Sequence, residues 1–434
     1  FSNATSFNSD ISDWNVSNVT DMSYMFQGAT LSTANYDSLL LSWSKQDVQP
    51  YVDFHGGNSK YSSASVNSRQ ALVDKDWTIT DGGVLSSDAT LSDLTTTEGS
   101  LNPEFNAATT SYTVTVSSSV TSLTVTGTTS HTNATMTPSD GKLSFTELLV
   151  GWNEQILTVI AEDGKTTQEY KVKVYRQSND ATLSGLTTDE GSLSPDFSPT
   201  EMNYTVMVPY ETTSLIVTGT KADDNATMDP PEGKLEFTNL SVGTEAEKTI
   251  TVIAEDGKTT QEYTVKVYRQ SNVATLSDLT TTEGSLNPEF NAATLEYTVT
   301  VPSSVTSLTV TGTKADDNAM MTPADGKLEF TGLSVGWNEQ ILTVTSEDVS
   351  ATKEYKVKVY RQSNDATLSD LTTDKGSLSP VFSPTTTSYT VTVPYETTSL
   401  IVTGTKADDN ATMDPSNGNL LFENLSVGTS SERT

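Results

Sequence analysis

The densest set of potential metal ligands is a polar loop, Lys-Ala-Asp-Asp-Asn, that occurs at residues 221–225, 314–318 and 406–410. Carboxylate and amide oxygens are the ligands that Ca²⁺ prefers. The candidate calcium ligands are Asp223, Asp224, Asp316, Asp317, Asp408 and Asp409. The spacing lacks the terminal Glu of a helix-loop-helix calcium loop, and Asp and Asn are also favoured in solvated turns. We therefore expect ordinary turns and no required cofactor, with calcium as the alternative.

Few residues are available for nucleophilic or redox chemistry. The chain has no Cys, which excludes disulfides, thiolate nucleophiles and cysteine-ligated metals. Its two histidines, His55 and His131, have no adjacent Ser or acidic triad pattern. Phosphate-binding glycine loops and His-Glu-x-x-His are absent, and the acids lie mainly in repeated turns instead of the paired arrangement that glycoside hydrolysis needs. We predict that the chain is not an enzyme.

Aromatic side chains offer a different kind of contact. If the strands alternate, Tyr175, Tyr268 and Tyr360 share a face with neighbouring lysines. Trp152 and Trp337 both lie in Gly-Trp-Asn-Glu-Gln segments. Such rings can stack on sugars, but amphipathic Tyr and Trp also cover domain junctions and domain ends. We favour the second interpretation and keep these five residues as candidate ligand contacts.

These residues recur because the chain is repetitive. The tetrapeptide Ala-Thr-Leu-Ser starts at Ala89, Ala181, Ala274 and Ala366, at steps of 92, 93 and 92 residues. This length fits one small β-sandwich per copy. The predicted sandwiches are 88–179, 180–272, 273–364 and 365–434, and we expect the last to be truncated and to lack its final two strands. The junctions are too short for flexible tethers, so we expect stiff spacers.

Apolar residues alternate with Thr or Lys inside each copy, as in half-buried strands. The segment 155–176 predicts a strand pair that turns at Asp163-Gly164. A second glycine turn, at Asp140-Gly141 in the first copy, predicts a two-residue hairpin. In the third copy Val349 replaces the first turn's Gly. Because a β-branched residue avoids positive φ, we expect another loop geometry there and the loosest hairpin of the set.

The first 84 residues follow another pattern. Phe-x-x-Ala-Thr occurs at Phe1 and again at Phe26, with apolar residues at steps of two or three between them, as in a leucine-rich solenoid. We predict one solenoid coil over 1–30 and a cap over 31–84. The cap is expected to contain a helix with Thr33 as its N-cap, a second helix near 63–74, and short strands at 52–54 and 77–80.

Charge restricts the partners. With 24 Lys and Arg against 56 Asp and Glu, the net charge is −32, so nucleic acid and anionic membranes would be repelled. No apolar run reaches the length of a membrane-spanning helix, and we expect no membrane insertion. The chain opens on Phe1 without a signal-like segment, so we expect any signal peptide to lie outside this sequence.

Two resemblances to known families indicate where the protein acts. SFNSDISDWNVSNVTDMSYMF, and the segment from LSTANYDSLL to DWTITDGG, resemble BspA-like leucine-rich bacterial surface proteins. The motifs ATLSDL, EGSLNPEF, SYTVTV, VGWNEQILTVIAEDG and EYKVKVYR, in that order, resemble the cadherin-like β-sandwich domain. These families imply a mainly β fold, export, and display outside the cell. The calcium motifs of cadherins proper are absent, so their calcium-dependent adhesion is not implied.

The prediction is therefore an acidic, extracellular, surface-displayed repeat protein that adheres to a protein or polysaccharide ligand. The architecture is tandem Ig- or cadherin-like β-sandwiches after the C-terminal end of a leucine-rich-repeat-like solenoid with a small α/β cap. The alternative is a spacer or carbohydrate-binding region of a secreted polysaccharide-degrading enzyme.

Overall fold

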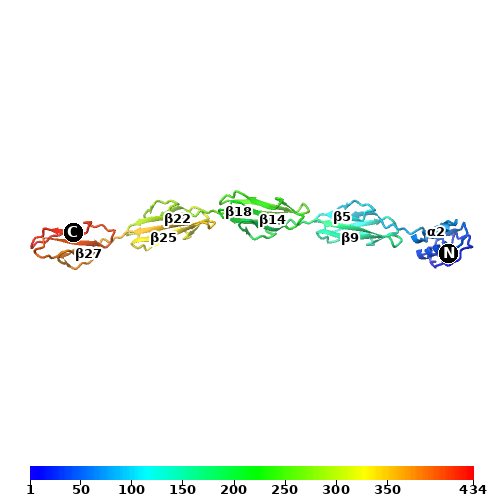
Figure 1. Ribbon diagram of the computed structural model, residues 1–434, viewed down its shortest axis with the longest axis horizontal. Helices are drawn as coiled ribbons and strands as arrows, with labels where there is room; N and C mark the ends of the chain where they lie inside the picture. The colour runs from blue at the N-terminus through cyan, green and yellow to red at the C-terminus, as the bar shows by residue number, and fades with distance from the viewer. The chain divides into compact units, whose positions relative to one another are not determined.

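The computed structural model describes all 434 residues and divides into two compact units. Unit 1 comprises Phe1–Ser184, Thr220–Pro231 and Thr251–Gln261. Unit 2 comprises Gly185–Gly219, Glu232–Ile250 and Glu262–Thr434. In both units the strands of a copy lie in two layers, as the ribbons of Figure 1 show.

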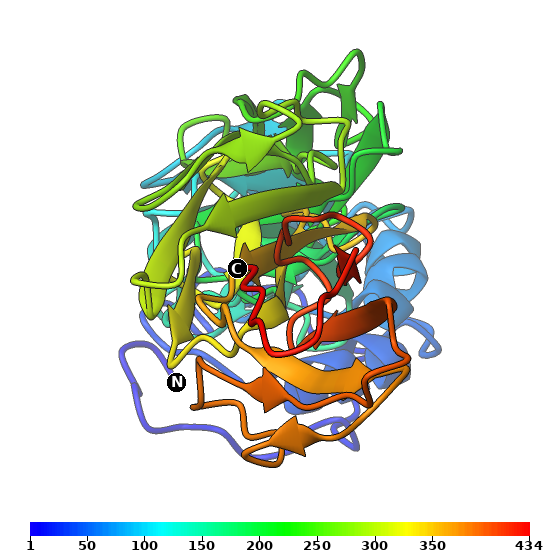
Figure 2. The same ribbon diagram turned by 90° about the vertical axis from the view of Figure 1, so that its left-hand side faces the viewer.

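The N-terminal part of unit 1 contains the helices of the chain, drawn as blue coils in Figure 2. Its elements are α1 (Thr33–Trp43), β1 (Asp53–His55), η1 (Ser63–Ser65), α2 (Val66–Val73) and β2 (Thr78–Thr80). Ser32, not Thr33, caps α1, because its hydroxyl accepts from the Asn35 N–H. The buried residues of α1 share one core with Ile11, Val16, Met22 and Phe26, and β1 pairs with β2 in parallel.

The first copy is a sandwich of a three-stranded and a five-stranded sheet, in the orders β3-β6-β8 and β4-β5-β10-β9-β7. Its strands are β3 (Leu91–Thr96), β4 (Leu101–Asn102), β5 (Ser111–Val116), β6 (Leu123–Thr129), β7 (Thr135–Thr137), β8 (Lys142–Phe145), β9 (Gly151–Ile160) and β10 (Thr167–Arg176). Strand β10 lies at the centre, antiparallel to β9 and parallel to β5. The alternating residues Tyr170, Val172 and Val174 are buried between the sheets.

The second copy has the same strands, and each unit holds part of it. The strands are β11 (Leu183–Thr188), β12 (Leu193–Ser194), β13 (Asn203–Val208), β14 (Leu215–Lys221), β15 (Thr227–Asp229), β16 (Lys234–Phe237), β17 (Glu245–Ile253) and β18 (Thr260–Arg269). In unit 1, β15 pairs with the end of β17. In unit 2, β13 pairs with β12 and with β18, and β14 pairs with β16.

The third copy, in unit 2, repeats the two sheets of the first with the orders β19-β22-β24 and β20-β21-β26-β25-β23. Its strands are β19 (Leu276–Thr281), β20 (Leu286–Asn287), β21 (Glu296–Val301), β22 (Ser307–Lys314), β23 (Met320–Thr322), β24 (Lys327–Thr331), β25 (Gly336–Thr345) and β26 (Thr352–Arg361).

The fourth copy forms a three-stranded sheet, β27-β30-β31, and a two-stranded sheet, β28-β29. Its strands are β27 (Leu368–Thr373), β28 (Leu378–Ser379), β29 (Thr390–Val391), β30 (Ser399–Lys406) and β31 (Asn419–Glu423). Leu368 and Leu371 are only half-buried, whereas the equivalent Leu276 and Leu279 of the third copy are buried. The fourth core is therefore less covered than the third.

Two turn predictions are wrong. The Asp140-Gly141 turn does not close a hairpin, because β7 before it belongs to the five-stranded sheet and β8 after it to the three-stranded sheet. The turn instead carries the chain from one layer to the other, with Gly141 at φ +70°. Val349 does not change its loop: its φ is +62°, against +68° and +66° for the equivalent Gly164 and Gly257. The third hairpin keeps the glycine geometry and accepts the strain.

No helix of the chain is both long enough and apolar enough to cross a membrane.

Candidate functional site

In each of the first three copies, a glutamate in the turn after β9, or after the equivalent strand β17 or β25, binds the segment that leads into its own copy. These junction glutamates are Glu162, Glu255 and Glu347. In the second copy Glu255 Oε2 accepts from the N–H of Ser178 at 2.9 Å, and the N–H of the next residue, Asp256, donates back to the Ser178 carbonyl at 3.1 Å. Charge-assisted bonds of this kind are stronger than neutral ones. The hairpin is thereby fixed to the incoming chain.

The same pair of bonds recurs at the other two junctions. Glu347 accepts from the Ser271 N–H at 2.9 Å, and Glu162 accepts from the Ser86 N–H at 3.1 Å. Ser178 and Ser271 are buried, with 7% and 8% of their surface exposed. Because a buried N–H without an acceptor is costly, each glutamate meets a requirement of the junction backbone.

Tyrosines of one copy reach the junction glutamates of the next. The Tyr175 hydroxyl donates to Glu255 Oε1 at 2.7 Å and accepts from Asn225 Nδ2 at 3.2 Å. Tyr268 makes the corresponding bonds to Glu347 and Asn318, at 3.3 and 3.0 Å. Tyr360 accepts from Asn410 Nδ2 at 2.8 Å. The three candidate tyrosines therefore have their hydroxyls bound at copy junctions.

At the first junction a lysine takes the place of the tyrosine. Lys60 Nζ of the cap lies 2.5 Å from Glu162 Oε1, and the same oxygen accepts from Asn133 Nδ2 at 2.6 Å. Burial raises the pKa of Glu162, but hydrogen bonds from Lys60, the Ser86 N–H and Asn133 outweigh it and hold that pKa at about 2. His131 Nε2 lies 3.9 Å from the other oxygen of this carboxylate. The other histidine, His55, accepts the Gly57 N–H at Nδ1.

The aspartate after each junction glutamate holds its own turn. Backbone N–H groups of Thr259 and Lys258, with the Ser118 hydroxyl, lower the pKa of Asp256. Burial raises the pKa of Asp348, but bonds from Ser350, Ser346 and the Tyr210 N–H lower it to about 2. Both carboxylates also bond to the preceding copy, through Ser118 in one case and Tyr210 in the other.

Lysine ammonium groups occupy the polar loops that suggested calcium. Lys221 Nζ donates to the carbonyls of Asp224 and Ala226, each at 2.5 Å. Lys314 and Lys406 make the same pair of contacts in their loops. These carbonyls are the kind of oxygen that a calcium ion would use. In these loops the lysine ammonium group already donates hydrogen bonds to those carbonyl oxygens.

The six candidate calcium aspartates are not brought into a common cluster. One oxygen of Asp223, and likewise of Asp316, caps its loop through the N–H of Asn225 or Asn318. The second oxygen of both aspartates is buried and has no hydrogen-bond partner. Asp224, Asp317 and Asp409 are exposed. Nowhere do three or more His, Cys, Asp or Glu side chains gather as metal ligands.

The two candidate tryptophans lie on the outer face of the five-stranded sheet in the odd copies. Trp152 stands directly across from Tyr175 in the β9–β10 register, with ring centroids 4.9 Å apart and the planes at 61°. Trp337 and Tyr360 repeat the pair at 5.0 Å and 57°. Trp152 is 59% exposed and Trp337 61% exposed. Each odd copy therefore presents one accessible aromatic corner, and these pairs are called the Trp–Tyr corners below.

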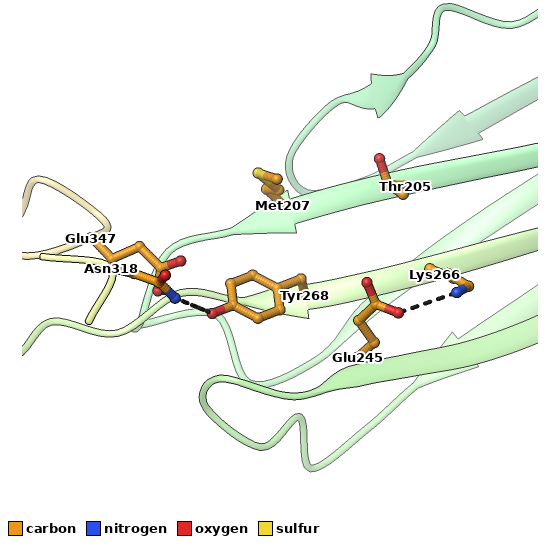
Figure 3. Close-up of a pocket in the computed structure, with 7 residues that line it drawn as sticks. All are labelled: Thr205, Met207, Glu245, Lys266, Tyr268, Asn318 and Glu347. Carbon is orange, nitrogen blue, oxygen red and sulfur yellow. Dashed lines mark hydrogen bonds and ion pairs between the residues drawn. The ribbon is translucent and has the colours of Figure 1, made fainter. Parts of the chain in front are cut away.

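A hollow of about 320 Å³ lies beside Tyr268, the junction tyrosine of the second copy, and is lined also by Asn318 and Glu347 of the third copy. Figure 3 shows Tyr268 between the Asn318–Glu347 pair and the Glu245–Lys266 ion pair, with Met207 and Thr205 on the neighbouring strand. In the repeat alignment Glu245 stands where Trp152 stands in the first copy. The even copy thus replaces an aromatic corner with an ion pair.

Comparison with known families assigns the repeats. The model of the "Cadherin-like beta sandwich domain" matches residues 91–177, 180–270, 276–362 and 368–421. The chain belongs to the cadherin-like beta sandwich family. The cadherin-like copies occupy most of the chain. The fold is mainly β, and the tandem sandwiches follow a small helical N-terminal part in the sequence. A second model, "Mycoplasma protein of unknown function, DUF285", matches residues 1–67.

No curated protein matches the chain. Among solved structures, the protocadherin GammaB4 extracellular domain is 11% identical at a TM-score of 0.31 and covers 69% of this chain, which spans 53% of that one. Drosophila N-cadherin EC1-4 is 9% identical at 0.21, covering 66% of this chain and 78% of its own. A putative glycoside hydrolase from Bacteroides thetaiotaomicron is 20% identical at 0.17, covering 28% and 31%.

Sequence reasoning missed the junction glutamates of the cadherin-like copies. Glu162, Glu255 and Glu347 each precede the turn aspartate in an Ala- or Ser-Glu-Asp segment. The repetition of that glutamate in all three complete hairpins was the available signal. Its serine partner lies about 76 residues earlier in the chain, as in the pair Ser86–Glu162, so no local pattern could have joined the two.

Proposed function

We propose that this chain is part of an extracellular surface protein whose cadherin-like copies serve as adhesion modules and stiff spacers, without catalysis. One observation carries the proposal: each complete copy fastens itself to the segment before it by the same glutamate, serine and turn bonds. Such repeated bonds restrict rotation at a junction, which is what a spacer needs and a flexible linker lacks. The acidity of the chain, at −32, favours solubility and self-repulsion outside a cell.

The Trp–Tyr corners support a direct role in binding. An exposed Trp beside a Tyr is typical of interaction surfaces, because both rings combine apolar area with a polar group. Each corner lies beside ion pairs such as Lys171–Glu154 in the first copy. This composition favours a neutral polysaccharide or a protein surface as the ligand, and the net charge of −32 disfavours polyanions.

The test is binding of the full chain to a glycan array and to immobilised extracellular matrix proteins. We expect saturable binding to at least one surface, and loss of at least tenfold in affinity in the double variant Trp152→Ala, Trp337→Ala. The control is Tyr51→Ala, because Tyr51 is 78% exposed on the cap and lies in neither corner. Absence of binding to all surfaces would leave the spacer role but contradict adhesion by this chain.

The alternative, a carbohydrate-binding region of a secreted polysaccharide-degrading enzyme, rests on the same corners. It predicts binding to soluble oligosaccharides of a plant or microbial polysaccharide, with no binding to matrix proteins. The pattern of hits on the two surfaces separates the two functions.

A further inference from the structure

The hollow beside Tyr268 contains a carboxylate oxygen that no donor of the chain occupies. Both side-chain bonds of Glu347 go to one atom, because Oε2 accepts from the Ser271 N–H at 2.9 Å and from the Tyr268 hydroxyl at 3.3 Å. At the preceding junction Glu255 divides the same two kinds of donor between its two oxygens. Glu347 lines the hollow, and its Oε1 is accessible to solvent. This oxygen is therefore available to a donor from outside the chain.

The charges around this oxygen are mainly negative. Lys266, the lysine that lines the hollow, is already shared by two carboxylates, at 3.2 and 3.7 Å. One oxygen of Asp316 is buried and has no hydrogen-bond partner. Removal from water raises the pKa of the Tyr268 hydroxyl, and the negative charges of Glu347 and Asp316 raise it further. The potential in the hollow therefore favours a cation.

The rest of the lining favours an organic cation over a metal ion. Figure 3 shows the Tyr268 ring between the two charged groups of the hollow, with Met207, which is 63% exposed, on the neighbouring strand. In the first copy the Trp152 ring lies 4.9 Å from the equivalent tyrosine, but here Glu245 stands in its place and supplies no ring. An aromatic ring attracts organic cations, and Met adapts to the shape of a ligand. Ca²⁺ instead needs about six to eight oxygen ligands.

We propose that this hollow binds the guanidinium group of an arginine side chain supplied by a partner protein. One guanidinium N–H donates to Glu347 Oε1, and the planar group lies against the Tyr268 ring. Arginine suits this place better than lysine, because its planar group is weakly hydrated, stacks on aromatic rings and carries several N–H donors.

Size and charge support this choice of partner. The volume of about 320 Å³ is at the lower end of the range of ligand sites, about 300–1,000 Å³, which suits one side chain with its neighbouring atoms. The net charge of −32 attracts basic segments of other proteins.

The inference rests on the proposed adhesion, because it names a basic protein segment as one partner. Its site is separate from the Trp–Tyr corners, and its test uses small probes instead of arrays. An array without hits would therefore leave this site to be measured, and a failure here would leave the corners unaffected.

The experiment follows the Met207 methyl signal by NMR in the full chain, labelled with ¹³C-methyl methionine and assigned with the variant Met207→Leu. The probes are a capped Gly-Arg-Gly peptide, the same peptide with uncharged citrulline in place of arginine, and N-acetylarginine amide. We expect a saturable shift with both arginine probes, at least as tight for the peptide, and no shift with citrulline. Binding should weaken as salt rises from about 0.05 to 0.3 M, because the charges are partly exposed.

Three variants locate the site. Glu245→Trp restores the residue that the odd copies have at this position, and the indole should fill the hollow and weaken binding by about tenfold or more. Glu347→Gln removes the carboxylate that accepts from the guanidinium group and should weaken binding by about tenfold. The matched control is Glu255→Gln, which removes the same charge at the preceding junction and should leave binding unchanged.

Folding of each variant is checked by far-UV circular dichroism and thermal unfolding. Equal shifts with the arginine and citrulline peptides would overturn the proposal, and so would full binding to folded Glu245→Trp. This variant decides the question even if Glu347→Gln loosens its junction, because Glu245 bonds to Lys266 and not to the junction backbone. Binding of the amide without the peptide would contradict a protein partner, and displacement of the peptide by about millimolar Ca²⁺ at constant ionic strength would assign the hollow to a metal ion.

Discussion

At the junctions, a single carboxylate accepts hydrogen bonds from donors that lie in distant parts of the chain. Glu255 takes a backbone N–H from Ser178 with one oxygen and the Tyr175 hydroxyl with the other. A glutamine in its place has no negative charge, so its bond to the Ser178 N–H is no longer charge-assisted, and its NH2 group can meet the Tyr175 hydroxyl only as a donor.

Glu255→Gln should therefore loosen one junction without unfolding the copies. Loss of one charge-assisted bond to a buried N–H corresponds to about a tenfold faster opening. We expect amide hydrogen exchange of Ser178 to accelerate by about that factor, while Ser271 at the next junction is unchanged and serves as the internal control. Equal exchange of Ser178 in both proteins would show that the glutamate does not hold the junction.

Glu162 gives the first junction a pH dependence. Its pKa is about 2 in the folded chain against an ordinary 4.5, so the folded state binds this proton less readily than the unfolded state. The stabilisation is complete above pH 4.5 and is lost as the pH falls towards 2. Thermal unfolding of the N-terminal part should show a smaller decline over this range in Glu162→Gln than in the original chain. An identical decline would assign the effect to other carboxylates.

Residue types alone revealed part of the site. The sequence made the Asp-Asp-Asn loops and the odd-copy tryptophans visible, because those residues cluster locally. It could not show that Lys221 fills its own loop with an ammonium group. Nor could it show that Tyr175 is bound by Glu255, 80 residues away, because such pairings depend on how one copy meets the next.

At the scale of elements, the turn of the third hairpin contains backbone strain, because a β-branched residue has a positive φ there. Val349 holds φ +62° in a loop where Gly257 of the second copy holds +66°, and a Cβ added at Gly257 would contact nothing. The cost of a side chain at this position therefore comes from backbone strain and not from a steric clash. Positive φ costs an L-residue about 1–2 kcal/mol. A glycine at the same position avoids this strain but loses about 0.5–1 kcal/mol more in chain entropy on folding.

Val349→Gly should stabilise the third hairpin by about 0.5–1 kcal/mol, and Gly257→Val should destabilise the second by a similar amount. Hydrogen exchange of the Ser346 and Ala254 amides, which close the two hairpins, measures both changes. Our expectation that the third hairpin is the loosest stays a prediction, and slower exchange at 348–351 than at 163–166 would contradict it.

A glycine in the central strand of the small sheet tests how the two layers pack. A Cβ at Gly312 would lie 2.4 Å from Leu342 Cδ2 of the opposite sheet, whereas at Gly404 of the fourth copy the nearest atom is Leu368 Cδ1 at 3.2 Å. Gly312→Ala should destabilise the third copy by about 1–3 kcal/mol through overpacking. Gly404→Ala should have a much smaller effect. Exchange rates of β22 and β30 amides in the two variants give the comparison, and equal losses would contradict it.

The strands themselves were predictable and their partners were not. Alternation placed Leu157 and Val172 on buried faces correctly, because a period of two is a local property. The Asp140-Gly141 turn was mistaken for a hairpin because turn chemistry fixes a reversal of the chain but not the sheet that the next strand joins.

At the scale of the whole chain, the question is whether metal ions or the chain's own side chains hold successive copies. Junctions that depend on calcium melt or loosen when the ion is removed, because binding to the folded state adds to its stability. Here the junction contacts include carboxylate–N–H, tyrosine–glutamate and tyrosine–asparagine bonds, the Lys60–Glu162 ion pair and the Ser118–Asp256 bond. In the loops of the candidate aspartates, Lys221 and its equivalents donate to backbone carbonyls.

We therefore expect the melting temperature of the full chain, and the exchange rates of Ser178 and Ser271, to be the same in about millimolar Ca²⁺ and in excess chelator. The matched variant is Lys314→Gln, which removes one ammonium group. It frees two carbonyls in the loop that also contains the unpartnered Asp316 oxygen, so this loop should bind a cation more readily than the original one. Stabilisation of the original chain by Ca²⁺ would contradict direct bonding as the main tie. Stabilisation of the variant alone would show that the lysine occupies the position that a cation would otherwise take.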